Sequence, residues 1–208
     1  MESPDTFTLL PLAMDPTTKS ISISSTQPPS SALANELAAL NALHRSLVAV
    51  ESTANGTPPP PVPVNPKRSA QIGKLRESGN AEFRKGNAAQ AVKLYTLAID
   101  MALGRPVWEP SGLVREEVSS LLSNRAQAQM AQQLWAEGAL DAEASVEMKK
   151  VGNAKAWWRR GKCLLEMGRL DEAETWVGQG LEFEATEQDL VSLKDEIEKK
   201  KGGGAIKV

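Results

Sequence analysis

The chain has 208 residues, of which 41% are hydrophobic and 24% are charged, as expected for a soluble protein with a globular core. Its net charge of −2 argues against a general nucleic-acid binder, because such proteins need an excess of basic side chains. The single cysteine, Cys163, excludes an internal disulfide, and with the single histidine, His44, it does not make a metal site. We therefore expect Cys163 in the core, His44 on a helix surface and no cofactor.

No part of the chain predicts insertion into a membrane. The acidic start MESPDTF lacks the basic region of a signal peptide. No stretch approaches the ~20 consecutive apolar residues that a membrane-spanning helix needs. We expect a soluble protein of a reducing compartment that can still dock on a membrane-bound partner.

The first elements in chain order are a short hairpin and a helix. In TFTLLPLAMDPTTKSISIS, apolar residues precede a turn-like Asp15-Pro16-Thr17, and isoleucines alternate with serines after it, which predicts two strands. SSALANELAALNALHRSLVAV predicts a helix whose leucines form one stripe. A hairpin and one helix make a poor core, so the stripe covers either the rest of the chain or a partner. This leucine stripe consists of Leu33, Leu37, Leu40, Leu43 and Leu47.

The proline-rich sequence NGTPPPPVPVNP predicts a semi-rigid linker, because consecutive prolines cannot make helical hydrogen bonds. Beyond it, apolar residues recur with helical periodicity over 69–103, 112–149 and 154–200. The tail GGGAIKV is too rich in glycine to order itself. We therefore divide the chain into an N-terminal docking module (1–52), the linker (53–66), a helical domain (67–200) and a flexible tail (201–208).

Two stretches of the helical domain repeat each other, SGNAEFRKGNAAQAVKLYTLAI and RRGKCLLEMGRLDEAETWVGQGL. Small residues at shared offsets allow the two helices of a hairpin to approach closely, and a larger residue in each stretch fills the gap to the next helix. The recurring positions are Gly79, Gly86, Ala91, Tyr95 and Ala98 in the first stretch and Gly161, Gly168, Ala173, Val177 and Gly180 in the second.

This pattern resembles the tetratricopeptide repeat (TPR), and the stretch between the two fits as a degenerate middle repeat. It keeps Ala126 but has Gln133 where the turn glycine usually stands. An excess of about 13 residues over the 34-residue TPR period is expected to lengthen the connection and the following helix. We predict an all-α fold of three TPR hairpins plus a C-terminal capping helix through Leu190, Leu193 and Ile197, preceded by a small α+β module. The alternative is an unrelated helical bundle.

One subset of TPR proteins, the carboxylate-clamp co-chaperones, reads the C-terminus of cytosolic heat-shock chaperones. Their pattern is a basic residue and an asparagine four apart in the first repeat, an asparagine in the second and a basic pair four apart in the third. This sequence has RESGN, SNRA and KAWWR at these places. The resemblance implies a peptide-carboxylate site of Arg76, Asn80, Asn124, Lys155 and Arg159.

These residue types suit a terminal carboxylate. Lys155 and Arg159 project from one helix face, as do Arg76 and Asn80. The cations offer charge-assisted hydrogen bonds, and the asparagine amides donate without adding charge repulsion. Arg76 stands where the family usually has lysine, which keeps the charge but changes the reach and hydrogen-bond geometry. We expect micromolar affinity that salt weakens.

Three neighbouring side chains are candidates for the peptide groove: Phe83, Met130 and Trp158. Each has an alternative role, since Phe83 suits core packing and Trp158 can simply shield the interface. No catalytic motif is visible, because the chain lacks G-x-S-x-G, a glycine-rich phosphate loop and a histidine near a nucleophile. We expect no enzymatic activity.

The order of a hairpin-plus-helix module, a proline linker and one clamp domain is similar to the small TPR subunit of the fungal post-translational ER translocation complex. This resemblance implies an adaptor, peripheral on the cytosolic face of the ER membrane. Its partners would be the C-terminal tail of seventy-kilodalton heat-shock chaperones and a membrane-anchored subunit docked on the leucine stripe, without nucleic acid or membrane insertion. The alternatives are a structural scaffold that binds an internal segment of a partner, and a soluble cytosolic co-chaperone.

Overall fold

The computed structural model describes residues 11–24, 29–49 and 63–204. By contacts, the chain divides into two compact units, residues 1–61 and 62–208. Most of the proline-rich segment lies outside the described residues, so the linker stays a prediction. In the described part of the chain, no helix combines the length and apolar character needed to cross a membrane.

The first unit contains the expected hairpin and helix. Strands β1 (Leu12–Met14) and β2 (Ile21–Ile23) pair antiparallel, with Leu12 opposite Ile23. The Asp15 carboxylate accepts hydrogen bonds from the backbone N–H groups of Thr18 and Thr17, at 2.7 and 2.8 Å, and these bonds lower its pKa. This is the local turn chemistry that the DPT sequence predicted.

The side chain of Asn41 connects helix α1 (Ser31–Ala49) to the hairpin. The amide of Asn41 accepts from the backbone N–H of Ile21 at 2.7 Å and donates to the Ile21 carbonyl at 2.8 Å. His44 lies on this helix and is half-buried there.

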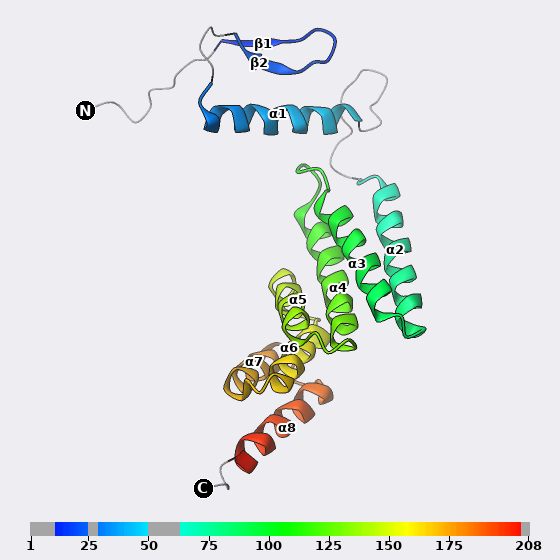
Figure 1. Ribbon diagram of the computed structural model, residues 1–208, viewed down its shortest axis with the longest axis vertical. Coiled ribbons are helices and arrows are strands. Elements are labelled where there is room, and N and C mark those ends of the chain that lie inside the picture. The colour runs from blue at the N-terminus through cyan, green and yellow to red at the C-terminus, as the bar shows by residue number, and fades with distance from the viewer. Residues whose placement is uncertain (1–10, 25–28, 50–62, 205–208) are drawn as a thin grey trace, which may run out of the picture. The chain divides into compact units, whose positions relative to one another are not determined.

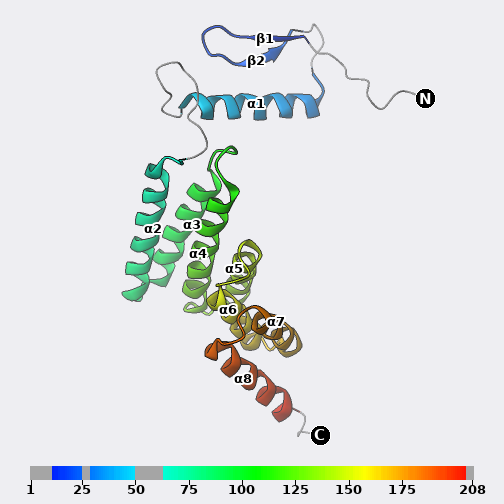
Figure 2. The ribbon, with the colours of Figure 1, turned by 180° about the vertical axis from the view of Figure 1, so that it is seen from behind.

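The second unit is a series of helical hairpins. Its helices are α2 (Pro66–Arg84), α3 (Ala88–Leu103), α4 (Ser111–Met130), α5 (Trp135–Met148), α6 (Ala154–Glu166), α7 (Leu170–Phe183) and α8 (Gln188–Gly204). Each helix packs on its neighbour in the chain, and α2, α4, α6 and α8 also contact one another in series (Figures 1 and 2). This arrangement confirms the predicted TPR fold with its capping helix.

The small residues of the repeat act as predicted. A Cβ atom added to Gly79 would lie 2.5 Å from the Tyr95 ring, and one added to Gly161 would lie 2.5 Å from Val177. Both distances are shorter than any real contact, so only glycine allows these helices to pack at this separation. Tyr95 and Val177 are fully buried and belong to the cores of the first and third hairpins.

A buried arginine secures the long connection between the first two repeats. Arg105 donates to both carboxylate oxygens of Glu117, at 2.7 and 2.8 Å, and to Glu109 at 2.6 Å. It also donates to the Ser69 hydroxyl at 2.7 Å, which connects α2 to this segment. The extra residues therefore form a connection that Arg105 holds in place. Helix α4 begins with an extension that carries Glu117.

The last helix extends beyond the boundary that we predicted between the helical domain and the tail. We expected a flexible tail from residue 201, but α8 continues to Gly204. The Lys201 ammonium lies 2.7 Å from Asp171 and 2.5 Å from Glu174 on α7, and these ion pairs hold the last turns of the helix. Leu190, Leu193 and Ile197 are buried against α6 and α7, as the capping helix requires.

The middle repeat has Gln133 at the turn where the first and third repeats have glycine, and this residue should lower its stability. Gly86 and Gly168 adopt φ values of +85° and +74°, and Gln133 adopts +60° at the equivalent turn. This conformation strains an L-residue but not glycine. We expect Gln133→Gly to raise the free energy of unfolding by about 0.5–1 kcal/mol in urea denaturation, because the relief of strain exceeds the entropy cost of glycine. The neighbouring Gln132→Gly, at a residue without positive φ, should not stabilise the protein, and a loss of stability in Gln133→Gly would contradict the strain.

Candidate peptide-carboxylate site

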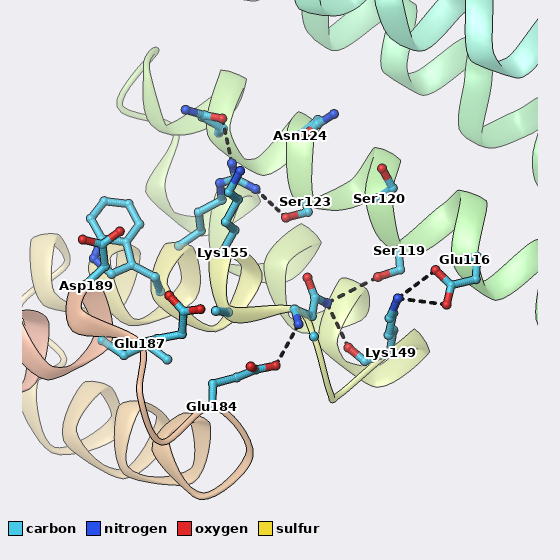
Figure 3. A pocket seen from close by; sticks show the side chains of 17 residues that line it. Glu116, Ser119, Ser120, Ser123, Asn124, Lys149, Lys155, Glu184, Glu187 and Asp189 are labelled. Atoms are coloured by element: carbon cyan, nitrogen blue, oxygen red, sulfur yellow. Dashed lines mark hydrogen bonds and ion pairs between the residues drawn. The ribbon is translucent and has the colours of Figure 1, made fainter.

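A pocket of about 730 Å³ opens between α4, the start of α6 and the start of α8. It is lined by Asn124 and Gln127 from α4 and by Lys155, Trp158 and Arg159 from α6. Figure 3 shows Asn124, Ser123, Ser120 and Ser119 following one another along α4, with Lys155 facing them. The structure thus brings three of the five expected clamp residues into one cavity.

Arg159 is the unusual member of this pocket because its charge is buried without an opposite charge. Its side chain is 6% exposed. The guanidinium donates to the Ser123 hydroxyl and, at 2.7 Å, to the Gln127 amide oxygen, both of which are neutral acceptors. Among the described residues, no carboxylate pairs with it. Burial lowers the pKa of this guanidinium to about 10, so it remains charged at pH 7.

Lys155 adds a second cation one helical turn before Arg159. It is exposed at the pocket, and no described acidic side chain forms an ion pair with it. Asn124 is half-buried on the facing helix and contributes amide N–H groups. A cavity with two unpaired cations and amide donors attracts a small anion such as a carboxylate.

The first-repeat residues Arg76 and Asn80 do not line this pocket. The Asn80 amide oxygen accepts from the Tyr95 hydroxyl at 2.8 Å and from the Asn124 amide at 3.4 Å. Asn80 is therefore connected to the pocket through Asn124. Arg76 has a 44% exposed side chain and makes a 3.3 Å ion pair with its neighbour Glu77. A pair this exposed is weak, so Arg76 is able to change partner.

The start of α6, which carries Lys155 and Arg159, is held by a network that sequence reasoning missed. The Asn153 amide donates to the backbone carbonyls of Lys149 and Ser145, at 2.9 and 3.2 Å. The Asn153 backbone N–H donates to Glu184 at 2.9 Å. The signal in the sequence was the asparagine before α6, a residue type that commonly bonds to nearby backbone groups.

Two of the three groove candidates are placed elsewhere. Phe83 packs against the core of the first hairpin, and Met130 lies beside Gly138 on α5. Neither lines the pocket. Trp158 does line it. Ser123 and Gln127, the partners of Arg159, were not foreseen.

Nothing in the described part of the chain forms a group of three or more histidine, cysteine or acidic residues able to hold a metal ion. Cys163 is buried, as expected, and burial raises the pKa of its thiol to about 12, so the thiol is protonated and unreactive. With its repeats and its cationic pocket, the chain is a TPR protein.

Comparisons with known proteins give the family. No family model matches the chain. It is 38% identical over 140 residues to the ER protein translocation subcomplex subunit sec67 of Schizosaccharomyces pombe, covering 65% of this chain and 72% of that protein. The chain belongs to the family of this ER translocation subunit.

Other similarities concern the TPR domain or the fold alone. The heat shock protein sti1 homolog of S. pombe is 28% identical over 124 residues, which is 60% of this chain but 19% of that protein. A chain of the Sec complex from S. cerevisiae superposes with a TM-score of 0.67 at 23% identity, over 92% of this chain and 98% of that one. The second TPR domain of human RPAP3, solved with an HSP70 peptide, gives 0.53 at 23% identity, over 63% and 98%.

The buried charge of Arg159 makes a prediction about stability. For a basic group, a pKa below its ordinary value means that the unfolded chain holds the proton more tightly than the folded one. The charge therefore costs stability at pH 7, and the cost disappears as the pH rises above about 10. We expect Arg159→Gln to raise the thermal midpoint at pH 7, measured by circular dichroism.

Arg105 provides the matched control, because it is buried to the same extent but paired with two carboxylates. Arg105→Gln should lower the free energy of unfolding by about 3 kcal/mol, since it leaves Glu109 and Glu117 without their cation. A destabilisation of similar size in Arg159→Gln would mean that Arg159 supports the fold rather than a ligand.

Proposed function

We propose that the pocket binds the acidic C-terminal tail of cytosolic seventy-kilodalton heat-shock chaperones. The protein would thereby recruit these chaperones and their precursor clients to the ER post-translational translocation machinery. The observation that carries this proposal is the nearly buried Arg159, which lies in a cavity large enough for a peptide end and whose charge is not paired with any described carboxylate.

The chemistry follows from the donors. A chain that ends in aspartate presents an α-carboxylate and a side-chain carboxylate close together. One carboxylate would take the place of the neutral acceptors at Arg159, while Lys155 and Asn124 donate to the other. Arg76 and Asn80 would close the site from α2. Each charged hydrogen bond contributes ~1.5–3 kcal/mol before desolvation.

Similar domains support this choice of ligand. The RPAP3 domain described above was solved with the HSP70 peptide SGPTIEEVD. The first TPR domain of Spaghetti, with a TM-score of 0.54 and 23% identity, was solved with the HSP90 peptide SRMEEVD. Both ligands are peptides that end in aspartate, which is the terminus our pocket is suited to bind.

Calorimetry with a peptide that ends in Glu-Glu-Val-Asp tests the proposal. We expect Lys155→Ala, Arg159→Ala and amidation of the peptide each to weaken binding roughly tenfold to hundredfold, equivalent to ~1.4–2.7 kcal/mol. Lys93→Ala, at an exposed lysine on α3 outside the pocket, should leave affinity unchanged. Equal affinity for the free and amidated peptides would contradict the carboxylate site.

The rival function is a scaffold whose groove holds an internal segment of a partner. A free acidic C-terminal peptide separates the two functions, because it should displace a bound chaperone but not an internal segment that lies outside the pocket. Competition that releases the chaperone from the purified protein supports the proposed function, and failure to compete supports the scaffold.

We further propose that the leucine stripe docks the protein on a membrane-anchored subunit at the cytosolic face of the ER. Leu33, Leu37 and Leu43 are half-buried, and Leu40 is 41% exposed. The side chain of Leu47 lies outside the described residues. The hairpin also exposes Leu12 and Met14. This first unit therefore leaves apolar surface available for a partner.

Co-purification with the translocation complex from fungal membranes tests the docking face. We expect Leu40→Asp to reduce recovery of the complex at least tenfold without altering peptide affinity. Ala42→Asp, which is also exposed but lies on the opposite side of α1, is the matched control and should retain the complex. Normal recovery with Leu40→Asp would remove the leucine stripe from the interface.

A further inference from the structure

The pocket that holds the cations has an acidic side. Glu184, Glu187 and Asp189, from the α7–α8 connection and the start of α8, line the same cavity as Lys155 and Arg159. Figure 3 shows Glu187 and Asp189 on the other side of Lys155 from the row of α4 side chains. Charge in the cavity is therefore divided, with cations and amides toward α4 and α6, and carboxylates toward α8.

The three carboxylates differ in their availability to a ligand. Glu184 already accepts the backbone N–H of Asn153 at 2.9 Å. Glu187 and Asp189 are exposed, and within the described ranges no lysine or arginine forms an ion pair with either. Asp189 also lies in the first turn of α8, where a negative charge suits the helix dipole. We call Glu187 and Asp189 the acidic rim.

The pocket is long enough for the ligand residues that precede the terminal carboxylate to lie near this rim. The pocket residues of α4 run from Glu116 to Gln127, which is about 16 Å along the helix axis. An extended peptide covers that length with about five residues. When the terminal carboxylate lies at Arg159, the residues just before it are still inside the same cavity as the acidic rim.

We infer that the acidic rim makes the pocket select C-terminal tails by charge. It favours basic side chains among the few residues before the terminal carboxylate, and it weakens without abolishing the binding of tails that carry glutamates there, the Glu-Glu-Val-Asp tail included. The inference rests on the proposed function, because it requires the terminal carboxylate to lie at Arg159. Each rim charge is exposed, so the expected effect is modest compared with the loss of the clamp.

Two nine-residue peptides test the acidic rim in calorimetry with the full chain. Both end in Val-Asp, and the third, fourth and fifth residues from the end are all lysine in one and all glutamate in the other. Replacing the rim with Glu187→Gln/Asp189→Asn should shift the ratio of the two affinities threefold to tenfold in favour of the glutamate peptide. High salt should diminish this shift, because the charges are exposed.

A control keeps the net charge of the protein constant between variants. Asp195→Asn/Glu198→Gln removes two carboxylates from α8 outside the pocket and should leave the ratio as in the unmodified chain. A ratio that does not differ between the rim variant and this control overturns the inference while leaving the carboxylate site intact. Failure of both peptides to bind the unmodified chain overturns the proposed function and the inference together.

Discussion

A guanidinium that is buried beside neutral acceptors is the constraint on which the site depends. Removing a cation from water is costly unless an opposite charge replaces the lost hydration, and the partners of Arg159 among the described residues are the neutral Ser123 and Gln127. The helices of the second unit hold it there because their own packing stabilises the fold. The pocket therefore has a charge that an incoming carboxylate would neutralise, which favours an anionic ligand over a neutral one.

The repeat pattern determines where this charge lies. Gly161 allows α6 to contact Val177 and Leu193 closely, and Gly180 does the same beneath Trp157. The Trp157 indole N–H donates to the Lys150 carbonyl at 2.9 Å, which fixes the start of α6. Through these contacts, small residues far from the ligand set the orientation of the helix that carries Lys155 and Arg159.

The fold and the residue types of the site could be predicted from the sequence because they follow local spacing. Gly79 and Tyr95 indicated the hairpin packing, and the i, i+4 cations indicated a charged helix face. The burial of Arg159 could not be predicted, because it depends on the separation of α4 and α6. For the same reason the ion pairs that order Lys201 were missed, since they depend on another helix.

The adaptor combines two physically different surfaces, an apolar stripe on α1 and a charged pocket between α4, α6 and α8. The most direct measurement of the pocket is the side-chain Nε–Hε signal of Arg159 in nuclear magnetic resonance, assigned by its loss in Arg159→Lys. Our account predicts that this signal shifts when a peptide with a free terminal aspartate is added, and stays in place with the amidated peptide. A signal that is unchanged at a saturating concentration of the free peptide would contradict it.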